Sequence, residues 1–127
     1  MPEPGDILWC RWPLREVPGV PGPTARPVLV LETSIHEIDD GSRFAAVSVC
    51  YGTGNIEGVR AGDFVIATRG EAEALGLHKP TRFDVRHPKR LIWCEDYFLA
   101  PDYLRARNLT IGRLTEAQRL AVKAILG

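Results

Sequence analysis

A basic segment at residues 78–90 holds the side chains with the clearest potential for chemistry. It carries five lysines and arginines and a single acidic residue, Asp84. Residues 81–85 have the composition of a short strand, and the alternation of side chains along a strand then places Arg82, Asp84 and Arg86 on one face. Two guanidinium groups on one face match phosphate oxygens, and a carboxylate between them would stay ionised. The alternative is a solvated face on which Asp84 only neutralises its neighbours.

Two other positions place a polar side chain next to an apolar strand. Thr53 lies between two glycines in residues 52–55 (GTGN), where backbone N–H groups can approach a ligand closely, although the same residues also suit a plain turn. Arg26 follows a flexible loop and directly precedes a buried strand. Bases of single-stranded nucleic acid can stack on exposed aromatic rings, for which Trp12 and Tyr51 are candidates, although most tryptophans lie in the core.

The cysteines and histidines do not have the spacing of a metal site. Structural zinc sites usually show two cysteines or two histidines a few residues apart. Here they are isolated at Cys10, Cys50, Cys94, His36, His78 and His87. No phosphate-binding or dinucleotide-binding glycine motif is present either. We therefore expect no metal and no cofactor.

Composition limits the class of protein. The chain has 127 residues, with 16 basic and 16 acidic side chains and no formal net charge, so it does not coat nucleic acid by overall charge. It is 45% apolar, yet no run approaches the ~18 consecutive apolar residues of a membrane helix. Three widely spaced cysteines fit reduced thiols rather than a disulfide framework, so we expect a cytoplasmic location.

Short elements must position these residues. We expect strands at residues 6–12, 28–31, 43–51, 63–67, 81–85 and 91–94, a long proline-rich loop at 13–27, and one helical turn at 71–75. Thr115 and Gln118 have the spacing of a capping box that starts a C-terminal helix. Its expected buried face is Ala117, Leu120, Ala121, Ala124 and Ile125. The pattern predicts one mainly β domain spanning residues 1–127, a small and strongly curved sheet with a C-terminal helix.

Four segments in the right order resemble the MazF/PemK family of toxin–antitoxin ribonucleases. They are residues 4–9 (PGDILW), residues 26–31 (RPVLVL), the apolar strand that ends in residues 51–53 (YGT), and residues 112–115 (GRLT) with the helix that follows. The resemblance spans nearly the whole chain. It implies an SH3-like barrel, usually a homodimer, that cuts single-stranded RNA without metal.

The resemblance also implies roles for particular residues. Arg26 and Thr53 match the positions that serve the transition state in the family, and Arg82 and Asp84 look like its acid–base pair. Because an arginine has a pKa above ~12, we assign Arg82 to charge stabilisation rather than to general acid catalysis. RNA contacts are expected from Trp12, Tyr51, Asn55, Lys79 and Arg86.

The chemistry that these residues would perform is transesterification. The RNA 2′-hydroxyl attacks the adjacent phosphate and leaves a 2′,3′-cyclic phosphate and a 5′-hydroxyl, so the enzyme must align the 2′-oxygen, accept its proton and stabilise the phosphorane. Arg26 and Arg82 suit the phosphate oxygens, and Asp84 suits the proton.

The resemblance further implies a cognate antitoxin whose disordered tail folds across the same groove. Two alternatives stay open: a barrel that inhibits another protein without chemistry, as the related CcdB toxins do, and an inactive family member. The loop at 13–27 lacks the histidine that some members carry, which keeps the second alternative open.

Overall fold

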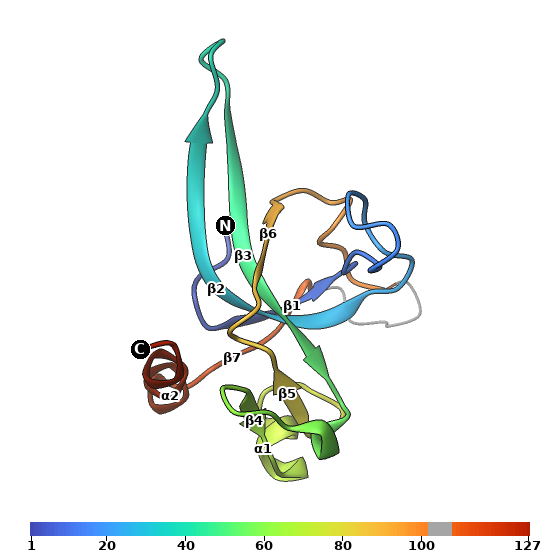
Figure 1. The fold of residues 1–127 in the computed structure, drawn as a ribbon, viewed down its shortest axis with the longest axis vertical. Helices are drawn as coiled ribbons and strands as arrows, with labels where there is room; N and C mark the ends of the chain where they lie inside the picture. Colours follow the sequence, from blue (N-terminus) through green and yellow to red (C-terminus); the bar gives the residue numbers. More distant parts are fainter. Residues whose placement is uncertain (102–107) are drawn as a thin grey trace.

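The computed structural model describes residues 1–101 and 108–127, and it is mainly β with a C-terminal helix (Figure 1). A single curled, antiparallel sheet has the strand order β4–β5–β3–β2–β1–β7, and β6 pairs with β3 beside β5. The strands are β1 (Asp6–Cys10), β2 (Arg26–Glu37), β3 (Arg43–Thr53), β4 (Phe64–Ile66), β5 (Thr81–Phe83), β6 (Lys89–Ile92) and β7 (Thr110–Arg113). The helical elements are η1 (Ile56–Gly58), α1 (Arg69–Ala74) and α2 (Glu116–Leu126). The expected fold class is confirmed.

The β2–β3 hairpin is the longest element pair and rises out of the body as an arm (Figure 1). The predicted strand at residues 28–31 was too short, because residues 32–37 also pair with residues 43–48. At its tip Gly41 adopts a φ of 84°, which favours glycine, and the Ile38 N–H donates to the Ser42 carbonyl.

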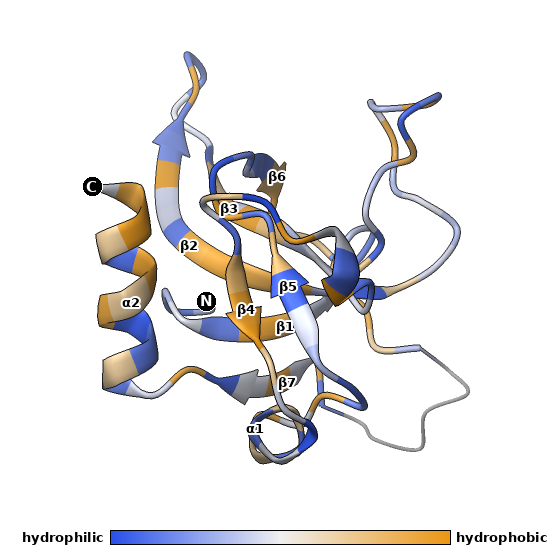
Figure 2. Ribbon diagram, turned by 60° about the horizontal axis from the view of Figure 1, so that its bottom comes forward, coloured by the Kyte–Doolittle hydropathy of each residue, from blue (hydrophilic) through white to orange (hydrophobic). Residues whose placement is uncertain are grey.

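Both faces of the sheet are buried at its centre. Ile7, Leu29 and Cys50 lie in a core cluster with β4, α1 and α2, whereas their neighbours Leu8 and Val49 lie in a second cluster with β6. Figure 2 shows the first half of β2 in the colour of hydrophobic residues. Successive side chains of a strand point to opposite faces, so a strand with two buried faces is apolar throughout. This arrangement explains the continuous apolar run at residues 28–31.

Several predicted boundaries were wrong by a few residues. The strands at 63–67, 81–85 and 91–94 are shorter or shifted, and Cys94 lies beyond the end of β6. The helical turn is α1, which starts earlier because the Thr68 side chain caps it by accepting from the Glu71 N–H. Strand β7 was not predicted; its four residues pair with β1 across an irregular register, which gives no periodic signal.

Helix α2 has the predicted capping box but a different buried face. The Thr115 hydroxyl accepts from the Gln118 N–H, and the Gln118 side chain accepts from the Thr115 N–H. The helix buries Val122 and packs Ile125 against the core, whereas Leu120 is 58% exposed. Leu120 and Val122 are about 200° apart around a helix, so only one of them can face the sheet. Val122 and Ile125, one turn apart, together bury two branched side chains, whereas the predicted face consisted largely of alanines.

Candidate functional site

The end of β3 and strand β5 form one wall of an open cavity of about 380 Å³. In the antiparallel β3–β5 pair Thr53 is directly opposite Arg82, and the Asp84 N–H continues the pairing by donating to the Tyr51 carbonyl. Directly opposed residues share a face, as do residues two apart. The cavity is accordingly lined by Tyr51, Thr53, Arg82 and Asp84, together with Arg15 and Arg60.

Two glycines allow this wall to form. A Cβ on Gly52 would lie 2.6 Å from Cε1 of the buried Phe83 and 3.1 Å from the Pro27 carbonyl oxygen, so the close packing of β3 on β5 requires glycine here. A Cβ on Gly54 would lie 2.2 Å from the Lys79 Cε, which places the Lys79 side chain over this turn. Residues 52–55 therefore have a packing role, whatever ligand the site takes.

Arg82 is held from two sides. Its Nε donates to the Asn55 carbonyl at 2.7 Å, and its Nη1 lies 3.1 Å from Oδ2 of Asp63. The Arg82 side chain is 16% exposed and that of Asp63 4%, so water screens this ion pair poorly. Asp63 also accepts from the Arg60 N–H at 2.8 Å. Asn55 thus contributes its backbone oxygen to the site.

Sequence reasoning missed Asp63. Its only signal was an acidic residue just before an apolar strand, which is a common arrangement. Nothing in the spacing connects it to Arg82, because the contact arises from the antiparallel pairing of β4 with β5. Arg15 and Arg60 were missed for the same reason: each comes from a loop whose path the sequence does not define.

Asp84 is paired differently from the prediction. Strand β5 ends at Phe83, and the chain turns so that the Asp84 Oδ1 lies 2.8 Å from Nδ1 of His87. Arg86 points elsewhere: its Nη2 lies 3.4 Å from the Ile125 carbonyl, at the end of α2. The prediction that Arg86 shares a face with Asp84 is therefore wrong, because the chain turns after Asp84, whereas Arg82 and Asp84 do line the same cavity.

A row of aromatic and cationic side chains adjoins the cavity at Tyr51. The Arg26 guanidinium lies 5.9 Å from the centre of the Tyr51 ring, and the Tyr51 and Trp12 rings are 5.6 Å apart. On the far side, the Lys89 Nζ lies 5.8 Å from the centre of the Trp12 ring. Both rings are half-buried, which leaves them fixed but accessible. Three of the predicted residues, Arg26, Tyr51 and Trp12, therefore lie in one continuous row beside the cavity.

The cysteines are not among the residues that line the cavity. Burial raises the pKa of Cys10 and of Cys50 to about 12, so neither thiol is ionised near neutral pH. Within residues 1–101 and 108–127, no group of three His, Cys, Asp or Glu side chains is placed to hold a metal ion. No helix in that same part of the chain is long and apolar enough to cross a membrane.

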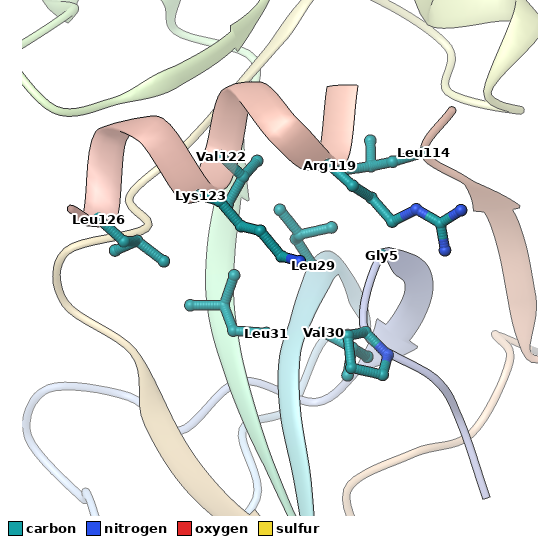
Figure 3. A pocket seen from close by; sticks show the side chains of 10 residues that line it. Gly5, Leu29, Val30, Leu31, Leu114, Arg119, Val122, Lys123 and Leu126 are labelled. Atoms are coloured by element: carbon teal, nitrogen blue, oxygen red, sulfur yellow. The ribbon is translucent and has the colours of Figure 1, made fainter. Parts of the chain in front are cut away.

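A second cavity, of about 90 Å³, lies between α2 and β2 (Figure 3). Leu29, Leu31, Val122 and Leu126 make it apolar, and the aliphatic parts of Lys123 and Arg119 border it. Apart from the charged ends of Lys123 and Arg119 its lining is apolar, so it is suited to an apolar side chain.

No protein-family model matches this sequence, and no curated protein matches it either.

Proposed function

We propose that the protein is a metal-independent endoribonuclease that cleaves single-stranded RNA, and that it acts as the toxin of a type II toxin–antitoxin system. One observation carries the proposal: Thr53 and the pair Arg82 and Asp84, predicted from two separate segments, line the same cavity. Beside them lies the Arg26–Tyr51–Trp12 row. The motif resemblance to MazF and PemK proteins supports the same reading.

The charges of the cavity suit a phosphodiester. Its lining includes three arginines and one carboxylate, and Asp63 neutralises only Arg82. Arg15 and Arg60 are therefore available for the oxygens of a phosphorane, whose charge exceeds that of the diester. A divalent metal prefers several oxygen ligands, commonly carboxylates, and this lining offers one carboxylate. The donor set thus favours catalysis by side chains.

Each residue has a distinct part in the proposed reaction. Arg82, fixed by Asp63 and Asn55, is preorganised to stabilise the phosphorane without reorienting. Thr53 would donate a hydrogen bond to a phosphate oxygen or bind the attacking hydroxyl. Asp84 would take part in the removal of the proton from the 2′-oxygen. The row beside the cavity offers two rings to the flanking bases, and each stacked base would contribute about 1–3 kcal/mol.

The first experiment is cleavage of an end-labelled, mixed-sequence single-stranded RNA in EDTA. The wild type should leave 2′,3′-cyclic phosphate ends, Arg26→Ala should slow cleavage because the row beside the cavity loses its cation, and Asp84→Ala should show whether this carboxylate is required. Arg43→Ala is the matched control, since Arg43 lies exposed on the hairpin arm. Metal dependence, or no cleavage of any RNA, would contradict the proposal.

A binding protein without catalytic activity is the second candidate. The apolar cavity beneath α2 and the exposed Leu120 favour it, because both are suited to protein contacts. Toxicity on expression without RNA cleavage, insensitive to Arg26→Ala, would select this candidate. In the nuclease, by contrast, an antitoxin segment that covers the basic cavity would suppress cleavage.

A further inference from the structure

His87 is bonded to the one carboxylate of the catalytic cavity. The Nδ1 atom of its ring lies 2.8 Å from Oδ1 of Asp84, and its backbone N–H donates to the Asp84 backbone carbonyl at 3.2 Å. The two residues thus share one tight turn, and Asp84 lines the cavity. The His87 side chain is 76% exposed; it is not among the residues that line the cavity, and its contact with the cavity is made through Asp84.

This pairing determines which ring nitrogen is available. An ionised Asp84 accepts a hydrogen bond only from a protonated Nδ1, so the neutral ring keeps its lone pair on Nε2. Within the described part of the chain, Nε2 has no hydrogen-bond partner. A carboxylate that orients an imidazole in this way is the arrangement found in the catalytic triads of hydrolases.

An imidazole suits the proposed reaction better than a carboxylate. General base catalysis is most efficient when the pKa of the base is close to the working pH. Carboxyl side chains ordinarily have a pKa of about 4 and imidazoles of about 6.5, so at neutral pH an imidazole is the stronger base that is still unprotonated.

We infer that His87 is the general base of the proposed ribonuclease and that Asp84 positions it. The inference rests on the proposed function and refines the part that Asp84 plays in it. As the bond from the 2′-oxygen to phosphorus forms and the bond from phosphorus to the 5′-oxygen breaks, the 2′ proton passes to Nε2 of His87. The 5′-oxygen takes a proton from water, and the imidazolium returns its proton to solvent.

The other charged groups around Asp84 and His87 are of types that do not change charge near neutral pH, so they should not add to the pH dependence of cleavage. Arg15, Arg60 and Arg82 share the cavity with Asp84, and arginines stay charged at any pH used here. Cys50 lies behind Asp84 in the core, and burial raises the pKa of its thiol to about 12. Histidine is the residue type whose charge ordinarily changes between about pH 5 and 8, so the pH profiles of the wild type and of the His87 variants are the informative comparison.

The test is the rate of single-turnover RNA cleavage in EDTA between about pH 5 and 9. The wild-type rate should rise through the range in which imidazoles lose their proton. His87→Gln should remove this rise and lower the rate at pH 7.5 by about 10²- to 10⁴-fold. Added imidazole should restore part of the activity of His87→Ala. Asp84→Asn should slow cleavage but keep the rise, because the imidazole is still present.

His36→Ala is the matched control and should cleave like the wild type. His36 lies on the hairpin arm, where it stacks on Phe44 and bonds Ser34. Thermal unfolding confirms that each variant is folded. The inference is overturned if His87→Gln keeps the rise, or if the rise is lost in Asp84→Asn instead, while wild-type cleavage upholds the proposed function. A wild type that does not cleave overturns both.

Discussion

The Arg82 guanidinium reaches across the β4–β5 pair to Asp63, and not to Asp84 two residues along its own chain. The contact joins Nη1 of Arg82 to Oδ2 of Asp63 at 3.1 Å, with both side chains largely buried. A second bond, from Nε to the Asn55 carbonyl, fixes the plane of the guanidinium. Arg82 is thus held in a fixed position before a phosphate binds in the cavity.

Asp63→Asn should destabilise the protein and loosen Arg82. Removing one charge from a largely buried pair leaves the other without compensation, so we expect a loss of about 2–4 kcal/mol in the free energy of unfolding. Urea denaturation measures it. Glu73→Gln in the exposed Arg69–Glu73 pair is the control and should change stability by less than about 0.5 kcal/mol. Equal losses in the two variants would show that the Asp63 pair is not shielded from water.

Arg60→Ala should weaken RNA binding with little effect on stability. The Arg60 side chain lines the cavity, and only its backbone N–H bonds Asp63, which alanine preserves. Loss of one phosphate contact should lower the slope of log affinity against log salt concentration by about 0.7 for a single strand. Fluorescence anisotropy of a labelled RNA in a salt series measures this slope. An unchanged slope would place Arg60 outside the phosphate contacts.

Sequence patterns predicted the local features of the fold, but not the contacts between segments that are distant in the sequence. The capping box at Thr115 and the apolar run at residues 28–31 follow from neighbouring residues, and the structure has both. These features depend on chemistry within a few residues. Propensity and periodicity describe that scale well.

The unpredicted features depend on pairing between distant segments. Whether Arg82 bonds Asp63 or Asp84 depends on the register of β5 against β4 and on where β5 ends, and no pattern within one segment defines either. The buried face of α2 is a similar case. Leu120 and Val122 are both apolar, and the sheet beneath the helix determines which one is covered.

Cys10 and Cys50 should resist thiol reagents, whereas Cys94 should react. The thiolate is the reactive form, and with pKa values of about 12 the two buried thiols stay protonated at pH 8. Labelling with a disulfide reagent at pH 8 should therefore modify one thiol in the native protein and three in urea. Rapid native labelling of all three would contradict the burial of the central strands.

The same shifts predict a loss of stability in alkali. A thiol whose pKa is higher in the folded than in the unfolded protein binds more protons when folded, so stability falls as pH rises. Its contribution is complete below the unfolded value, near pH 9, and is lost progressively toward about pH 12. Cys50→Ser, whose hydroxyl does not ionise in this range, should flatten this fall in melting temperature between pH 9 and 11, whereas Cys94→Ser should not.

Gly52→Ala should destabilise the site by packing alone. The added methyl group would lie 2.6 Å from Cε1 of Phe83, whose ring is fully buried and has nowhere to move, so we expect a loss of about 1–3 kcal/mol. Because the clash separates β3 from β5, it should also pull Thr53 away from Arg82 and lower any RNA cleavage.

Gly70→Ala is the control for Gly52→Ala, and it should change the free energy of unfolding in the opposite direction. Gly70 lies in α1, where a Cβ has nothing within 4 Å, so alanine should stabilise the helix by up to about 1 kcal/mol. Urea denaturation of both variants tests the pair. If Gly52→Ala unfolded at the wild-type urea concentration, β3 and β5 would have to be more loosely packed than the contact between Gly52 and Phe83 requires.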